Sequence, residues 1–291
     1  MGLSSHGAAV DCGVLPIARP TQTAPPTAAT QRLPDSQLVP GAKDLSWVWL
    51  ASPTRRYPHT ALGSPVHAGS VHALAALPGG GWREVAYELP LQRVFEDRVP
   101  RLVDLDGDGR DELLLIESDL LQGAALVVLG LRGDGSAQAP LKLVELARGP
   151  AVGSTFRWLN PVGVADFDGD GHLDVASITT PHVGGMLFLY HYRPPLLEPF
   201  AKAMDVSNHR MGALEQGLAV IVQQAGKRPT VVVPDMSQRA LHALRWEAPG
   251  QWKELADLMP MAARAERLTP LPDGACVGLS DGSWARVTLT P

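Results

Sequence analysis

Two short acidic stretches of the chain repeat one arrangement of carboxylates. Acidic residues stand at positions one, three, five and nine of residues 104–112 and again of residues 166–174, with glycines at positions four and six. The carboxylates are Asp104, Asp106, Asp108 and Glu112 in the first stretch, and Asp166, Asp168, Asp170 and Asp174 in the second. Oxygen ligands at this spacing, in a chain that glycine allows to turn tightly, can surround a hard cation that takes six to eight oxygens. We interpret both stretches as calcium loops. The alternative is a pair of acidic turns, in which the crowded carboxylates would repel one another.

The EF-hand is the obvious rival interpretation, because it shares the first half of this pattern. An EF-hand needs a bidentate Glu at position twelve and a helix on each side of the loop. Position twelve is Leu115 in the first stretch and Ser177 in the second. The flanking segments are short apolar runs of strand length; they are residues 101–103, 113–116, 162–165 and 175–178. The sequence therefore predicts loops between strands and excludes the EF-hand.

Length and composition favour an all-β domain. The 291 residues include 29 glycines and 26 prolines, as expected of many short strands joined by turns. The net charge is −5, and the two acidic stretches with Arg110 account for −8 of it, so the rest of the chain carries +3. This small surplus offers no basic stripe for nucleic acid. We also expect no membrane span, since no stretch approaches about 20 apolar residues, and we expect a monomer.

The first 41 residues differ in composition from the remainder. They are rich in Ala, Pro, Thr and Gln, which predicts a disordered leader or linker over residues 1–41 and a folded domain over residues 42–291. No clear signal peptide is present, because nothing basic precedes a weak apolar run that His6 and Asp11 interrupt. Cys12 and Cys276 are the only cysteines. Since Cys12 falls in the predicted leader, we expect no disulfide.

Sets of strand-like segments repeat along the predicted domain. The copies begin near residues 48, 103, 164 and 220, with a remnant from residue 275. Aligned on loop position nine, they fall near His59, Glu112, Asp174 and Thr230, at intervals of 53, 62 and 56 residues. A period of this size with about four strands is typical of a propeller blade. We therefore predict one β-propeller, with five blades. The copies near 48 and 220 lack the acids, so only two blades are expected to bind calcium.

The two intact loops resemble the FG-GAP repeat, also called the VCBS repeat. The pattern Asp-x-Asp-Gly-Asp-Gly-x-x-Asp/Glu before an apolar strand looks like the repeat that builds β-propellers in integrin α-subunits and in many exported bacterial proteins. Two further segments, residues 157–161 and 207–210, are similar to segments of bacterial VCBS-repeat proteins. The resemblance implies two calcium ions as cofactors, held by the carboxylates named above together with the main-chain carbonyls of Arg110 and His172. Glu112 departs from the usual Asp at position nine.

A ligand site is expected on the face opposite the calcium loops. Strands of a blade run antiparallel, so alternate connections emerge at opposite ends, and binding residues commonly lie on loops of a rigid scaffold. The connections on the far side contain these candidates: Glu96, Asp97, Arg98, Asp119, Arg157, Trp158, Asn160, His182, Asn208, His209 and Arg210. Each of them could instead be structural, packing between blades or pairing within a turn.

Three functions from different classes remain open at this point. The first is a calcium-binding propeller that binds a partner protein, peptide or glycan. The second is a propeller enzyme, a glycan hydrolase or lyase, for which a pair of carboxylates would be needed; the candidates are Glu96, Asp97, Glu117 and Asp119. The third is a purely structural or assembly module. Because loops of this type tend to bind calcium at about 10⁻⁴ to 10⁻³ M, the expected location is the periplasm or the cell exterior.

Overall fold

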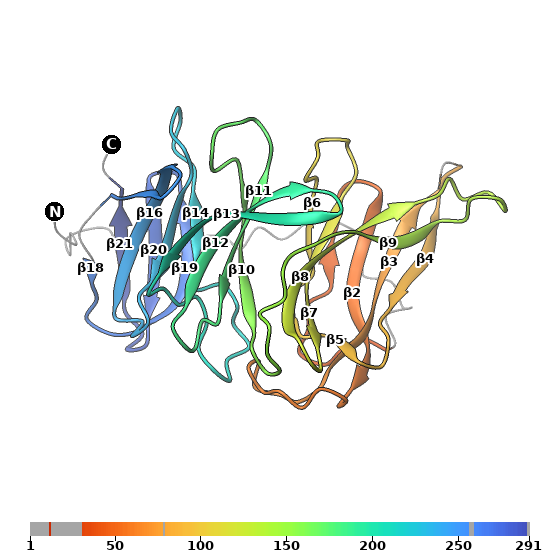
Figure 1. Ribbon diagram of the computed structural model, residues 1–291, viewed down its shortest axis with the longest axis horizontal. Coiled ribbons are helices and arrows are strands. Elements are labelled where there is room, and N and C mark those ends of the chain that lie inside the picture. Colours follow the sequence, from red (N-terminus) through yellow and green to blue (C-terminus); the bar gives the residue numbers. More distant parts are fainter. Residues whose placement is uncertain (1–11, 13–30, 78, 256–258, 290–291) are drawn as a thin grey trace. The chain divides into compact units, whose positions relative to one another are not determined.

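The computed structural model describes residue 12 and residues 31–77, 79–255 and 259–289. The chain divides into two compact units. Of the described residues, 31–159 and 192–198 belong to the N-terminal unit, and residue 12 with 160–191 and 199–289 belongs to the C-terminal unit. The elements of both are β-strands (Figure 1), which confirms the predicted all-β class.

The N-terminal unit is built on one antiparallel sheet. Its strands are β1 (Val39–Pro40), β2 (Leu45–Thr54), β3 (His67–Ala76), β4 (Trp82–Glu88), β5 (Arg93–Phe95), β6 (Arg101–Val103), β7 (Glu112–Asp119), β8 (Gly123–Arg132) and β9 (Lys142–Arg148). Their order in the sheet is β1-β2-β3-β5-β7-β8-β9, with β4 added beside β3 and β6 beside β7. The strand β7 is buried along nearly its whole length, as its apolar run predicts.

The C-terminal unit contains three strand groups. The first is β10 (Leu159–Ala165), β11 (Asp174–Thr179), β12 (Met186–Arg193) and β13 (Leu196–Met204), whose end residues at Leu159, 192–193 and 196–198 belong to the N-terminal unit. The second is β14 (Val220–Val222), β15 (Thr230–Pro234), β16 (Ala240–Ala248), β17 (Gln251–Glu254) and β18 (Met259–Pro260). The third is β19 (Ala265–Leu271), β20 (Gly274–Leu279) and β21 (Trp284–Thr288).

Neighbouring sheets of the C-terminal unit pack against each other through opposite faces of β15. Val231 and Val233 join one apolar cluster with Ile178 of β11. Val232, which points the other way, joins a second cluster with Val277 of β20. Because successive side chains of a strand alternate between its faces, this continuous run of valines covers both neighbours. The sheets are therefore stacked in layers within this unit.

The expectation that Cys12 forms no disulfide is wrong. Cys12 is buried and bonded to Cys276 of β20 in the C-terminal unit, with 5.5 Å between the two Cα atoms. The composition around Cys12 indicates a segment without a core of its own, but it carries no information on whether one side chain is anchored elsewhere. Residues 1–11 and 13–30 of the predicted leader lie outside the described residues.

The folded part of the chain also includes residues before position 42. Leu33 is fully buried in the apolar core of the N-terminal unit, and its main-chain N–H donates to the carbonyl of Leu50 at 2.8 Å. Among the residues that can be described, no helix is long and apolar enough to cross a membrane.

Candidate functional site

The first acidic loop connects β6 to β7 in the N-terminal unit. Val103 and Glu112 are paired at the base of the loop, and Gly107 and Gly109 adopt positive φ angles of 75° and 87°. That conformation strains any residue with a Cβ, so glycine is required for the turn. The Gly109 N–H donates to Asp104 Oδ2 at 3.1 Å. The Lys43 ammonium also contacts Asp104 and, by this hydrogen bond, holds the pKa of that carboxyl below its usual range.

The second acidic loop connects β10 to β11 in the C-terminal unit and has the same internal bonding. The Gly171 N–H donates to Asp166 Oδ2 at 3.0 Å, and the His172 N–H donates to Asp170 Oδ1 at 2.8 Å. The equivalent N–H of the first loop, that of Arg110, donates to Asp108 Oδ1 at 2.8 Å. The predicted repeat is thus reproduced at the level of individual hydrogen bonds.

The carboxylates at position nine differ from the others because they are buried. Glu112 and Asp174 are each 1% exposed. One oxygen of each accepts a main-chain N–H at position two of its loop, from Leu105 at 2.8 Å and from Phe167 at 3.0 Å. Burial raises the pKa of Glu112 to about 7 and the pKa of Asp174 to about 6. In each loop the buried carboxyl of Glu112 or Asp174 therefore lies close to the other carboxylates of the loop. That arrangement favours binding of a cation.

The carboxylates of each loop converge closely enough to hold a metal ion. Oxygens of Asp104, Asp106 and Asp108 lie within 4.8 Å of one another, and the same holds for Asp166, Asp168 and Asp174. Oxygen donors of this kind suit hard divalent cations.

His191, which sequence reasoning missed, forms a further group of possible ligands with Asp168 and Asp170. His191 lies on β12 directly across from Asp174 in the strand register. Its Nδ1 is 3.0 Å from Asp174 Oδ1, its Nε2 is 3.9 Å from Asp168 Oδ2, and its ring stacks on Phe200 at 4.0 Å between centroids. Only the register of β11 with β12 could have shown this, because His191 is 17 residues from Asp174 in sequence.

A groove of about 700 Å³ runs beside the second loop. Its walls include Asp166 and Gly169 of the loop, Ile221 of β14, and Lys227 and Arg228 of the following turn. The Arg228 guanidinium lies over the ring of Trp246, 5.2 Å from its centroid. The sequence prediction placed the ligand site on the other end of the strands, and this groove was not expected.

In the N-terminal unit, the predicted ligand residues Glu96, Asp97, Arg98 and Trp158 are buried. Glu96 accepts from Ser118 Oγ at 2.6 Å, and its other oxygen is 2.6 Å from His59 Nδ1. Asp97 pairs with Arg101 at 2.7 Å, and Trp158 donates its indole N–H to the Glu96 carbonyl. Arg98 donates to the carbonyl of Val66, and burial lowers its pKa. Arg157 of the same set is exposed. The hydrogen bonds and ion pairs of the buried residues hold the connecting loops in place.

The predicted residues of the C-terminal unit form a second buried network. The side-chain amide of Asn160 donates to the carbonyl of Gln216 at 2.9 Å, and Asn208 donates to the carbonyl of Asn160 at 3.1 Å. His182 Nε2 lies 2.8 Å from His209 Nδ1, whereas Arg210 is exposed and pairs with Glu266 at 3.1 Å. The structure thus joins Asn160 to Asn208 and His182 to His209.

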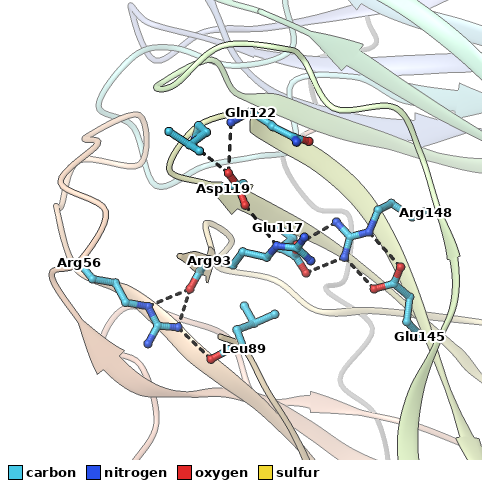
Figure 2. A network of polar contacts seen from close by, with 9 residues as sticks. Arg56, Leu89, Arg93, Glu117, Asp119, Gln122, Glu145 and Arg148 are labelled. Atoms are coloured by element: carbon cyan, nitrogen blue, oxygen red, sulfur yellow. Dashed lines mark hydrogen bonds and ion pairs between the residues drawn. The ribbon is translucent and has the colours of Figure 1, made fainter. Parts of the chain in front are cut away.

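The remaining predicted residue, Asp119, belongs to a chain of ion pairs in the N-terminal unit (Figure 2). Arg93 pairs with Asp119 at 3.3 Å and with Glu117 at 3.2 Å. Arg148 binds both oxygens of Glu117, at 2.8 and 2.9 Å, and also pairs with Glu145 at 2.7 Å. Burial opposes ionisation of Asp119, but the N–H groups of the turn that follows it donate to the carboxylate and lower its pKa. Asp119, Glu117 and Glu145 are therefore all paired with arginine.

Comparison with known proteins identifies the repeat. Residues 104–177, which contain both acidic loops, match the family model described as FG-GAP-like repeat, and this confirms the resemblance seen in the sequence. No curated protein matches the chain. Among solved structures, one from Bacteroides fragilis with the provisional name 6-phosphogluconolactonase aligns over 86% of this chain and 68% of that one, with a TM-score of 0.42 and 13% identity. A likeness at that level assigns neither a fold nor an activity.

Proposed function

We propose that this chain is a calcium-binding FG-GAP-type β-propeller of five blades that serves as a binding module outside the cytoplasm. The observation that carries the proposal is the convergence of carboxylates in two loops with the same internal hydrogen bonds. The acidic clusters can hold a metal ion, and calcium is the cation whose coordination number and oxygen preference suit a loop of carboxylates and carbonyls. Asp104, Asp106, Asp108 and Glu112 would hold one ion, and Asp166, Asp168, Asp170 and Asp174 the other.

Calcium would neutralise the carboxylates of each loop and stabilise the fold, and it would take no part in a reaction. Glu112 and Asp174 are buried beside other acids, and their raised pKa values reflect the cost of keeping a charge there. A divalent ion lowers that cost and fixes the turn. Lys43 and His191 provide weaker partners from outside each loop.

The repeat and the layered sheets support the propeller, whereas the blade number rests on the five strand sets counted in the sequence. An FG-GAP-like repeat spans residues 104–177, and within the C-terminal unit the strand β15 is covered by sheets on both faces. Sets of antiparallel strands that pack face to face in series are the construction of a propeller.

The location outside the cytoplasm is supported by the disulfide between Cys12 and Cys276. Disulfides persist in oxidising compartments and are rare where thiols are kept reduced. Weak calcium sites would also be filled only where calcium is abundant.

Isothermal titration with calcium tests the proposal directly. The chelator-treated full chain is expected to bind two ions, Asp106→Ala and Asp168→Ala one each, and the double variant none. Asp134→Ala is the matched control, because Asp134 lies in an exposed turn outside both loops and accepts only local hydrogen bonds from Ser136. The metal assignment would be refuted if Asp106→Ala and Asp168→Ala still bound two ions each, or if the parent bound none.

A further inference from the structure

A small pocket in the N-terminal unit lies where four strands end or begin. Its volume is about 200 Å³, which is room for one six-membered sugar ring. Its walls include Arg93 at the start of β5, Glu117 and Asp119 at the end of β7, Gln122 of the turn, Gly123 of β8, and Arg148 at the end of β9.

The charged groups around this pocket cancel. The charged residues of its wall are Arg93, Arg148, Glu117 and Asp119, and Arg56 and Glu145 lie beside them (Figure 2). The carboxylates pair with Arg93 and Arg148, and Arg56 donates to the carbonyl of Arg93 at 2.8 Å. Such a site has no net charge to attract an ion. It offers many donors and acceptors, which the surrounding contacts hold in fixed positions.

Some of these hydrogen-bonding groups remain open to a ligand. Among the described residues, Nη2 of Arg93 and the side-chain amide of Gln122 make no hydrogen bond, whereas Nε and Nη1 of Arg93 are held by Asp119 and Glu117. The Arg93 side chain is 38% exposed. The Asp119 carboxylate, 21% exposed, accepts from Arg93 and from two main-chain N–H groups and has lone pairs to spare.

The turn that contributes Gln122 to the pocket also carries an exposed apolar residue. Leu121, next to Gln122 on the turn, is 82% exposed. The turn is held by the loop after β9, since the Gly153 N–H donates to the Gln122 carbonyl at 2.8 Å. A Cβ at Gly123 would lie 2.2 Å from the carbonyl oxygen of Ser154, so the two backbones meet without a side chain between them. An exposed aliphatic side chain beside fixed polar groups suits a molecule with one apolar face and several hydroxyls.

We propose that this pocket binds one neutral sugar ring of a glycan. The Arg93 guanidinium, the Asp119 carboxylate and the Gln122 amide would bind its hydroxyls, and Leu121 would pack on the face of its C–H groups. The absence of net charge favours a neutral saccharide over an acidic one, since an acidic sugar would need surplus positive charge. The inference rests on the binding role proposed above and names the class of ligand for it.

Binding of the full-length chain to an array of neutral and acidic glycans, in calcium, tests this inference. The parent is expected to retain neutral glycans, and Arg93→Gln and Gln122→Ala should each lower the signal by about tenfold. Both variants should fold. In Arg93→Gln the buried Glu117 still pairs with Arg148, and Gln122 is exposed. The control is Arg193→Gln, whose arginine is 59% exposed and pairs with Glu198; it should bind like the parent.

Calcium titration of the same samples separates the two proposals. If calcium binds to two sites and no neutral glycan is retained, the sugar pocket is refuted while the calcium assignment stands. Retention of acidic glycans alone would also overturn the inference, because the arginines would then act as an anion site. Neutral binding that both pocket variants leave unchanged would place the glycan elsewhere and refute this pocket.

Discussion

At the residue scale, buried ionisable side chains at the loop ends of both units are held by other side chains. His209 is the extreme case. It is 1% exposed, its Nδ1 faces His182, and its Nε2 lies 3.0 Å from the carbonyl of Ala213. Burial and then the neighbouring His182 and Arg210 lower its pKa to about 3. The folded protein therefore keeps His209 neutral under conditions in which the unfolded chain protonates it.

We predict that His209 makes the fold sensitive to acid. Because the folded pKa lies below the unfolded value of about 6.5, the unfolded chain gains the proton first, and the free energy of unfolding falls as the pH drops from about 6.5 toward 3. The slope from this group is up to about 1.4 kcal/mol per pH unit. Urea unfolding of the parent and of His209→Gln at pH 7, 5.5 and 4.5, in chelator, measures it.

The control for this experiment is His72→Gln, whose histidine pairs with the half-exposed Glu84 in the N-terminal unit. The parent and the control should lose stability together, whereas His209→Gln should lose less. The same pH dependence in all three proteins would contradict the role given to His209.

The convergence of the acids within each loop could be predicted at this scale, but their outside partners could not. Spacing alone brings the aspartates of each loop together, because a short loop is a local structure. Lys43 and His191 come from other strands, so only the sheet register brings them to the loops. The same limit applies to Arg93 and Arg148, which meet at Glu117 from β5 and β9.

At the element scale, the strands that could be predicted are those that are buried along their length. The apolar runs at residues 113–116 and 175–178 lie within β7 and β11, which are buried along nearly their whole length. The sequence did not predict outer strands such as β4 and β13, because they bury only some of their residues and carry charged side chains on the other face. The repeat was therefore visible through its inner strands.

The disulfide acts on one element, β20, and its loss should be costly. Cys276 is fully buried in that strand and the bond spans 264 residues of sequence. Removal of a native disulfide typically costs about 2–5 kcal/mol, more where the closed loop is long. We predict that a reductant lowers the melting temperature of the parent and leaves Cys12→Ala unchanged. Equal melting of the parent with and without reductant, under conditions in which free thiols are detected, would contradict this prediction.

At the scale of the whole molecule, the chain forms two compact units, each with one acidic loop. The loop of the N-terminal unit joins β6 to β7, and that of the C-terminal unit joins β10 to β11, so each unit contains one of the proposed calcium sites. A ligand that binds only the folded state stabilises it by about 2.7 kcal/mol at a hundredfold excess over its dissociation constant. Calcium should therefore stabilise both units, one site in each.

Scanning calorimetry of the full chain in calcium and in chelator tests the central claim, that the two acidic loops bind calcium and stabilise the fold. We predict that chelation lowers the melting temperature by several degrees. Asp106→Ala and Asp168→Ala should each retain part of the shift, and the double variant almost none, while Asp134→Ala should behave like the parent. If the parent melts at the same temperature in calcium and in chelator, the loops are acidic turns and the calcium assignment is wrong.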